Sequence, residues 1–200
     1  WSFADSTTID TDLVVTNGTL SGTNDITVGG GDVTGDGIIN LTGGTFLVNT
    51  AGSFGGATAW TFYNLTIGAA GNATTTATGA GGITVSVLLT IDTGDTLDAK
   101  GKTWTLSGTS GTVFTISGTL NDSTDTSTFA FTGNNGGGNT TVPASTAYHN
   151  ITLNNSSETY VLAGTTTGDA GGVLTITDGT LSTTGSNYAL NIGAISIASS

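Results

Sequence analysis

Residues 88–108 read LLTIDTGDTLDAKGKTWTLSG, and the fold prediction depends on the pattern in this stretch. An apolar run is followed by a turn containing Asp and Gly, a Thr-Leu step, a polar loop and a second run that alternates apolar with polar residues. The same order recurs at residues 13–30, LVVTNGTLSGTNDITVGG, and at residues 173–193, VLTITDGTLSTTGSNYALNIG. Such self-similarity is typical of repeat architectures.

The three blocks can be aligned on one leucine each. Leu13, Leu89 and Leu174 take the same place in the pattern and are separated by 76 and 85 residues. We therefore expect residues 1–200 to form a single elongated repeat domain with roughly two and a half diverged copies of this unit. We also expect the three leucines to belong to one buried ladder.

The predicted fold class is all-β. Gly, Thr, Asn and Ser recur every few residues and are poor in helix interiors, whereas short runs alternating apolar residues with Thr or Ser read as strands. Irregular repeat length, one proline and few charged residues favour a β-solenoid of short Thr/Gly-rich strands, similar to a parallel β-helix. Tandem Ig-like β-sandwiches are the alternative, because the repeat length is compatible with them.

The charge balance excludes one class of partner. The chain has 14 acidic residues, two lysines and no arginine, and its net charge is -12. A surface this acidic repels phosphate backbones and anionic lipid, so we expect no nucleic-acid partner. No apolar stretch is long enough to span a bilayer, so we expect no membrane insertion. There is no cysteine for disulfides or thiolate metal sites.

A family resemblance is carried by TFYNLTI (residues 61–67) and ITVSVLLTIDTGDTLDAKGKTWTLSGT (residues 83–109). These blocks resemble the repeats of large secreted bacterial surface proteins, the adhesin- and autotransporter-like β-solenoids. The resemblance implies an extracellular or cell-surface stalk, fibre, filament or surface-layer subunit. It also implies repeats without catalytic residues.

His149 is the only histidine, and it lies in a second copy of the TFYNLTIG motif. Aligning AYHNITLN (residues 147–154) with residues 61–68 places His149 opposite Tyr63 and Asn150 opposite Asn64. A catalytic histidine is not expected to alternate with tyrosine inside a structural repeat. With no cysteine and no second histidine, we predict no catalytic site and no enzyme activity.

The acidic residues cluster next to Gly, Ser and Thr, where Asp commonly bonds to backbone amides in turns. Calcium is the alternative role for two of these clusters, and it is the one cofactor considered. GGGDVTGDG (residues 29–37) superficially resembles the calcium turns of repeat-in-toxin proteins, and DTGDTLD (residues 92–98) spaces oxygen ligands for a hard cation. The candidate ligands are Asp32, Asp36, Asp92, Asp95 and Asp98.

Nine Asn-x-Ser/Thr sequons are candidate glycosylation sites, although a chain rich in Asn and Thr produces such matches by chance. They begin at Asn17, Asn40, Asn64, Asn72, Asn121, Asn139, Asn150, Asn154 and Asn155. For Asn64 and Asn150 we expect instead an asparagine ladder between coils. The turn that carries Lys100 and Lys102 is expected to be exposed.

The expected function is structural, with partners that are copies of the chain or further repeats of it, joined end to end. The terminal stretch YALNIGAISIA (residues 188–198) is an apolar strand that invites pairing along its edge. A carbohydrate-binding adhesin module, with surface glycans as partners, is the first alternative. It would present aromatic side chains such as Trp60, Tyr63, Trp104 and Tyr160. A polysaccharide-active enzyme with converging acids is the second alternative.

Overall fold

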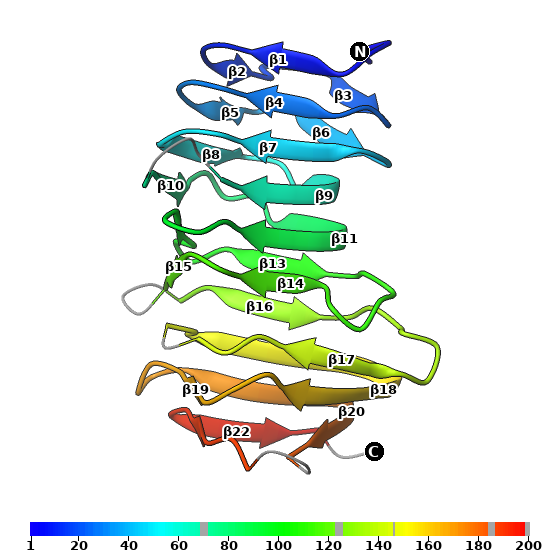
Figure 1. Cartoon of the computed structure of the whole chain (residues 1–200), viewed down its shortest axis with the longest axis vertical. Coiled ribbons are helices and arrows are strands. Elements are labelled where there is room, and N and C mark those ends of the chain that lie inside the picture. Colours follow the sequence, from blue (N-terminus) through cyan, green and yellow to red (C-terminus); the bar gives the residue numbers. More distant parts are fainter. Residues whose placement is uncertain (69–71, 123–125, 146, 184–186, 199–200) are drawn as a thin grey trace.

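The chain folds as a parallel β-solenoid of about nine turns, as the sequence predicts. The computed structural model describes residues 1–68, 72–122, 126–145, 147–183 and 187–198. Its coils stack along the long axis of the molecule, with the N-terminus at one end and the C-terminus at the other (Figure 1). The paired strands run parallel throughout the described residues, and this excludes the antiparallel sheets of the Ig-like alternative.

Each coil contributes short strands to three parallel series. The first series contains β3 (Thr19–Gly22), β6 (Ile38–Leu41), β13 (Thr103–Leu106), β16 (Thr128–Phe131) and β22 (Ala194–Ile197). The second contains β1 (Thr7–Ile9), β4 (Ile26–Val28), β7 (Thr45–Val48), β14 (Phe114–Ile116) and β17 (Asn139–Val142). Four longer, bent strands run through both series: β9 (Trp60–Ile67), β11 (Ile83–Ile91), β18 (Asn150–Leu162) and β20 (Val173–Ser182).

The third series is shorter than the other two. It contains β2 (Leu13–Val14), β5 (Val33–Gly35), β8 (Gly52–Gly56), β10 (Thr74–Ala77), β12 (Thr96–Asp98) and β15 (Thr119–Asn121). β19 (Thr166–Thr167) pairs with β21 (Leu190–Asn191) as a separate two-stranded sheet. Among the described residues there is no helix, and therefore none that could cross a membrane.

Register between neighbouring strands sets the coil length, which varies along the chain. Thr7 lies beside Ile26, an offset of 19 residues, whereas Thr103 lies beside Thr128, an offset of 25. Close contact between coils also selects particular residues. A Cβ on Gly35, whose φ is +128°, would lie 2.2 Å from the carbonyl oxygen of Val15, so only glycine fits there.

Buried side chains form ladders that run along the axis. The longest contains Leu20, Ile39, Trp60, Ile83, Trp104, Phe129, Ile151 and Leu174. Within it, the rings of Trp104 and Phe129 stack with centroids 6.0 Å apart. Parallel pairing brings alternate side chains of successive coils onto the same inward face, which produces such ladders.

The prediction that Leu13, Leu89 and Leu174 share one ladder is wrong. Leu13 lies beside Val33 in the third series, and Leu89 lies between Leu65 and Phe114 in the second. Leu174 lies beside Ile151 in the first series. Similar sequence blocks therefore occupy different sides of the solenoid.

Candidate functional site

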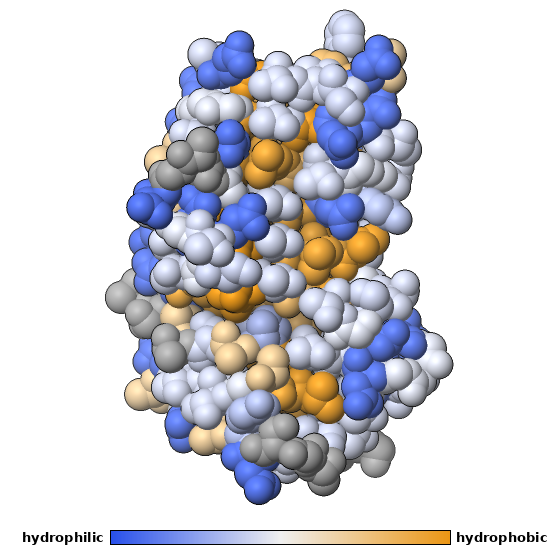
Figure 2. All heavy atoms as spheres, viewed as in Figure 1, coloured by the Kyte–Doolittle hydropathy of each residue, from blue (hydrophilic) through white to orange (hydrophobic). Residues whose placement is uncertain are grey.

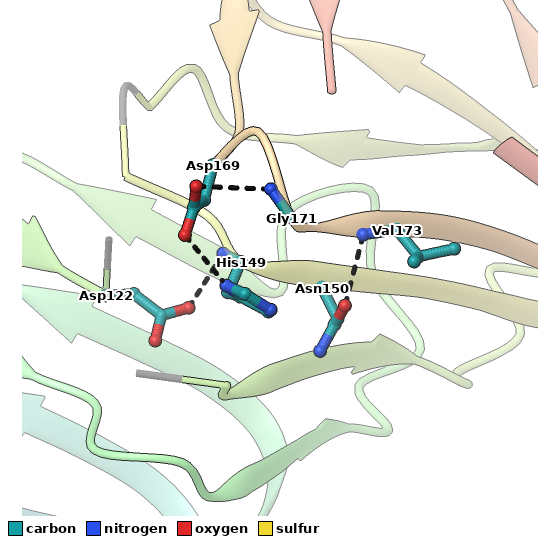
Figure 3. Close-up of polar contacts among 6 residues, drawn as sticks. All are labelled: Asp122, His149, Asn150, Asp169, Gly171 and Val173. Atoms are coloured by element: carbon teal, nitrogen blue, oxygen red, sulfur yellow. Dashed lines mark hydrogen bonds and ion pairs between the residues drawn. The ribbon is translucent and has the colours of Figure 1, made fainter. Parts of the chain in front are cut away.

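His149 lies at a corner of the solenoid, where the chain passes from β17 to β18. Its backbone N–H donates a hydrogen bond of 2.9 Å to Oδ2 of Asp122, and its ring Nδ1 lies 3.2 Å from Oδ2 of Asp169. Asp122 follows β15 and Asp169 follows β19, so the three residues come from successive coils (Figure 3). This is the one place among the described residues where a histidine meets carboxylates.

Local turn chemistry fixes the Asp169 side of this corner. Oδ1 of Asp169 accepts the N–H of Gly171 at 3.2 Å, and its carbonyl oxygen accepts the N–H of Gly172 at 2.9 Å. A Cβ on Gly172 would lie 2.0 Å from the carbonyl oxygen of His149, so the close approach of the two coils requires glycine. Next along the chain, Oδ1 of Asn150 accepts the N–H of Val173 at 3.1 Å (Figure 3).

The two carboxyl groups sit in contrasting electrostatic environments. Asp122 is 1% exposed, and burial raises the pKa of its carboxyl above the ordinary value, while the neighbouring Ser127 and His149 groups oppose the shift. At Asp169, the hydrogen bond from the Gly171 N–H is the largest cause of a lowered pKa, and the His149 ring lowers it further.

These contacts link coils and leave little for catalysis. A carboxylate–imidazole pair can activate a nucleophile when a hydroxyl or thiol lies within hydrogen-bonding distance of the ring. Among the described residues, the side chain bonded to the imidazole is the carboxylate of Asp169. In the same part of the chain, no group of three His, Cys, Asp or Glu residues could hold a metal ion.

The predicted correspondence between the two motif copies is wrong. Asn64 lies beside Thr45 and Leu88 in the second series, whereas Asn150 lies beside Thr128 in the first. His149 is therefore not the counterpart of Tyr63. The sequence resemblance between residues 61–68 and 147–154 does not extend to their position in a coil.

The first pair of calcium candidates is divided by β5. Asp32 is half-buried and uses its carboxylate between coils, because Oδ1 accepts the N–H of Ser53 at 2.7 Å. The N–H of Asp32 itself donates to Oδ1 of Asp12 at 2.8 Å, so equivalent carboxylates recur on successive coils. Asp36 is exposed at the other end of the strand.

The second group is also held by its own chain. Oδ1 of the buried Asp95 accepts the N–H of Ala73 at 3.0 Å, and Oδ2 of Asp98 lies 3.4 Å from the ammonium nitrogen of Lys100. Asp92 is exposed, and its carbonyl oxygen accepts the N–H of Asp95. Sequence reasoning expected Asp to bond within its own turn. Asp95 instead accepts an amide from the neighbouring coil.

Lys102 is buried, contrary to the exposed turn that the sequence suggests. It is 4% exposed, and its Nζ donates to the carbonyl oxygens of Gly79 at 2.9 Å and Gly81 at 2.7 Å. Burial lowers the pKa of this amine. The ammonium group satisfies carbonyl groups at the corner of the preceding coil that no strand partner reaches.

Sequence reasoning missed Glu158 altogether. This carboxylate is 2% exposed and accepts the N–H of Asn135 at 2.8 Å and the Thr140 hydroxyl at 3.0 Å. The glutamate follows a polar run in β18 that gives no apolar alternation, so no pattern marked it as buried. It holds a Gly-rich loop against the next coil.

The sequons fall into two groups. Nδ2 of Asn64 donates to the carbonyl oxygen of Gly44 at 3.3 Å, and Nδ2 of Asn155 donates to that of Thr132 at 3.2 Å. With Asn150, these side chains bond to the backbone of neighbouring coils, and not to one another as an asparagine ladder would require. The remaining sequon asparagines are exposed: Asn17, Asn40, Asn72, Asn121, Asn139 and Asn154.

Most of the aromatic candidates for sugar stacking lie inside the coils. Trp60, Trp104 and Tyr160 are fully buried, while Tyr63 is 38% exposed. A lateral groove of about 320 Å³ is lined by Ile116, Thr119, Leu120, Ala144, Ser145 and Thr165 among others. None of its lining residues is aromatic or acidic. The groove therefore presents neither a stacking platform nor a pair of acids.

The lateral surface seen in Figure 2 is mostly weakly polar, with small and separate apolar areas. Large apolar patches, which would mark a lateral partner, are not seen on this face. In comparisons with known proteins, the chain matches no family model, no curated protein and no solved structure.

Proposed function

We propose that this chain is a non-enzymatic structural segment of an extracellular protein, a solenoid stalk, fibre or surface-layer subunit that continues coil on coil. The observation that carries the proposal is the use of polar side chains between coils. Carboxylates, the buried lysine and three sequon asparagines each bond to the backbone of an adjacent coil. In an enzyme, such groups would converge on a cleft instead.

The burial of the aromatic side chains supports the same role. Phe54, Trp104 and Phe129 stack along the axis with centroids 6.4 and 6.0 Å apart, and they fill the solenoid interior. A side chain buried in this way stabilises the rod and is not available to a polysaccharide. The resemblance to adhesin- and autotransporter-like repeats agrees with a rod.

Composition supports a place outside the cell or on its surface. The net charge of -12 opposes lateral aggregation of a β-rich chain, and two lysines with no arginine leave few basic cleavage sites for proteases. The proposal therefore joins a mechanical role to an environment where long-lived surfaces are exposed.

Pulling single molecules between residues 1 and 200 tests this role. Coils of 19 to 25 residues should extend in steps of roughly 7 nm each, because an extended residue spans about 3.3–3.6 Å. The same protein should neither cleave nor bind polysaccharides in a panel that covers neutral and acidic glycans. Saturable glycan binding or release of oligosaccharides would reject a purely structural role in favour of an adhesin module or an enzyme.

A further inference from the structure

Exposed apolar side chains gather on the two end coils of the solenoid. At the N-terminal end Trp1 is 93% and Val14 58% exposed, and at the C-terminal end Ile195 is 58% and Ile197 71% exposed. Tyr188 adds to the C-terminal group. On the lateral surface the large exposed apolar side chains among the described residues are Ile38 and Tyr63. Exposed apolar surface of this kind marks a place where another chain packs.

The N-terminal end already begins the ladders of the first series. The Trp1 amine donates to the carbonyl oxygen of Thr19 at 2.7 Å, and the Ser21 N–H donates to the carbonyl oxygen of Trp1 at 2.8 Å. This parallel pattern sets Trp1 beside Leu20. Next to it lies a mainly apolar groove of about 370 Å³, lined by Trp1, Phe3, Leu13, Val14, Val15 and Leu20 among others.

The C-terminal end leaves the same ladders open. In β22, Ile195 lies beside Leu174 and Ile197 beside Ile176, and all four residues of the strand are exposed. β22 pairs with β20 along one edge only. Its other edge presents backbone groups and two isoleucines in the register that a further coil would use.

We propose that residues 1–200 bind a second copy of the same chain head to tail, with β22 of one copy covering residues 1–3 and the adjacent groove of the next. Ile195 then stacks on Trp1 and Ile197 on Phe3, which continues both ladders across the junction. Neither β22 nor residues 1–3 carries a charged side chain, so little desolvation of charge opposes the contact. The inference rests on the proposed structural function and names its partner.

A second copy is the occupant because the contact repeats one that exists within the chain. Every neighbouring pair of coils joins a C-terminal-facing edge to an N-terminal-facing edge in parallel register. The two free edges are thus complementary to each other, and neither is complementary to itself. Contacts of this heterologous type do not close on themselves, so they propagate into filaments.

The test uses the 200-residue chain released from a cleavable fusion so that Trp1 is its first residue. Sedimentation velocity over a concentration series should show oligomers that lengthen with concentration. Added salt should favour them, because both partners are acidic. The C-terminal variant Ile195→Lys/Ile197→Lys and the N-terminal variant Trp1→Lys/Val14→Lys should each lower self-association at least tenfold. The control Ile38→Lys/Tyr63→Lys carries the same added charge on the lateral surface and should assemble like the wild type.

Mixing the two end variants is the decisive step. Each keeps one intact end, so an equimolar mixture should give dimers and nothing longer, whereas each variant alone stays monomeric. The substituted side chains are already exposed, and unchanged thermal unfolding will show that each variant is folded. A wild-type chain that stays monomeric at the highest concentration, or a mixture that gives no dimer, overturns the head-to-tail contact. Neither result would bear on the coil-by-coil extension that tests the structural role itself.

Discussion

The ammonium nitrogen of Lys102 lies 2.7 Å from the carbonyl oxygen of Gly81, in the preceding coil. This buried cation takes the place of a strand partner at a corner where the backbone leaves the sheet. The same principle applies to Asp32, Asp95, Asp122 and Glu158, each of which accepts a backbone N–H from a neighbouring coil. The corners of the solenoid are therefore held by polar side chains, and its faces by strand pairing.

Lys102→Met should destabilise the chain, because two carbonyl groups lose their donor inside the structure. A buried polar group left without a partner costs about 1–3 kcal/mol, and we expect a loss in that range in urea unfolding. Lys100→Met is the matched control. Lys100 is exposed beside Asp98, and its loss should change the free energy of unfolding by no more than about 0.5 kcal/mol. Equal effects of the two substitutions would argue against a structural role for the buried lysine.

Trp104→Ala should cost about 3–5 kcal/mol, as expected for truncation of a large buried aromatic side chain. Trp104 is fully buried and stacks on Phe129 and Phe54, so the cavity would interrupt contacts between several coils. Trp1→Ala, at a site 93% exposed, should leave the stability of the monomer nearly unchanged. Chemical denaturation at a protein concentration too low for association measures both.

Asn64→Ser should lower the free energy of unfolding by about 0.5–1.5 kcal/mol, because the amide of Asn64 bonds to Gly44 in the preceding coil. Asn40→Ser, at an exposed sequon, should change it by a few tenths at most. Thermal unfolding of the two variants side by side gives the comparison. If Asn40→Ser proves the more harmful change, the assignment of these two asparagines is wrong.

Asp122 should destabilise the folded chain near neutral pH, because its pKa is raised by burial. A carboxyl whose folded pKa lies above its unfolded value costs stability while it is ionised, and the cost disappears as pH falls through the folded pKa. Asp122→Asn keeps an acceptor for the His149 amide. It should therefore be at least as stable as the wild type near neutral pH, with an advantage that vanishes below about pH 4. Asp122→Ala, which removes the acceptor, should be less stable by about 1–3 kcal/mol.

Asp169 should show the opposite dependence on pH. Its pKa is lowered, first by the Gly171 N–H and then by His149, so its contribution is present above the ordinary carboxyl range. That contribution is lost as pH falls through the folded pKa. Asp169→Asn should accordingly be less stable than the wild type near neutral pH, and the difference should close in acid. Urea unfolding at several pH values, followed by tryptophan fluorescence, measures both variants.

The strand class and the solenoid were predictable from sequence because they depend on local alternation and turn residues. The ladders were not, because coil length varies from 19 to 25 residues and irregularities shift the register between Val85 and Leu88 and between Asn154 and Thr159. Leu13 and Leu174 look equivalent in sequence yet lie on different sides. No periodic pattern can supply a register that changes from coil to coil.

The polar interior was harder still to predict. Lys102 is buried only because Gly79 and Gly81 leave carbonyl groups free more than 20 residues earlier. The carboxylates at Asp12 and Asp32 did offer a signal, since they recur at the spacing of one coil. That spacing can be recognised only after the coil length is known.

Fibre diffraction from aligned, concentrated protein tests most directly whether the coil stack continues from copy to copy. Parallel strands stacked along the axis should give a reflection at about 4.7–4.9 Å parallel to the filament axis. The filaments should disappear in the Ile195→Lys/Ile197→Lys variant and persist in the Ile38→Lys/Tyr63→Lys control. Filaments with that reflection perpendicular to their axis, or discrete monomers at high concentration, would contradict the account.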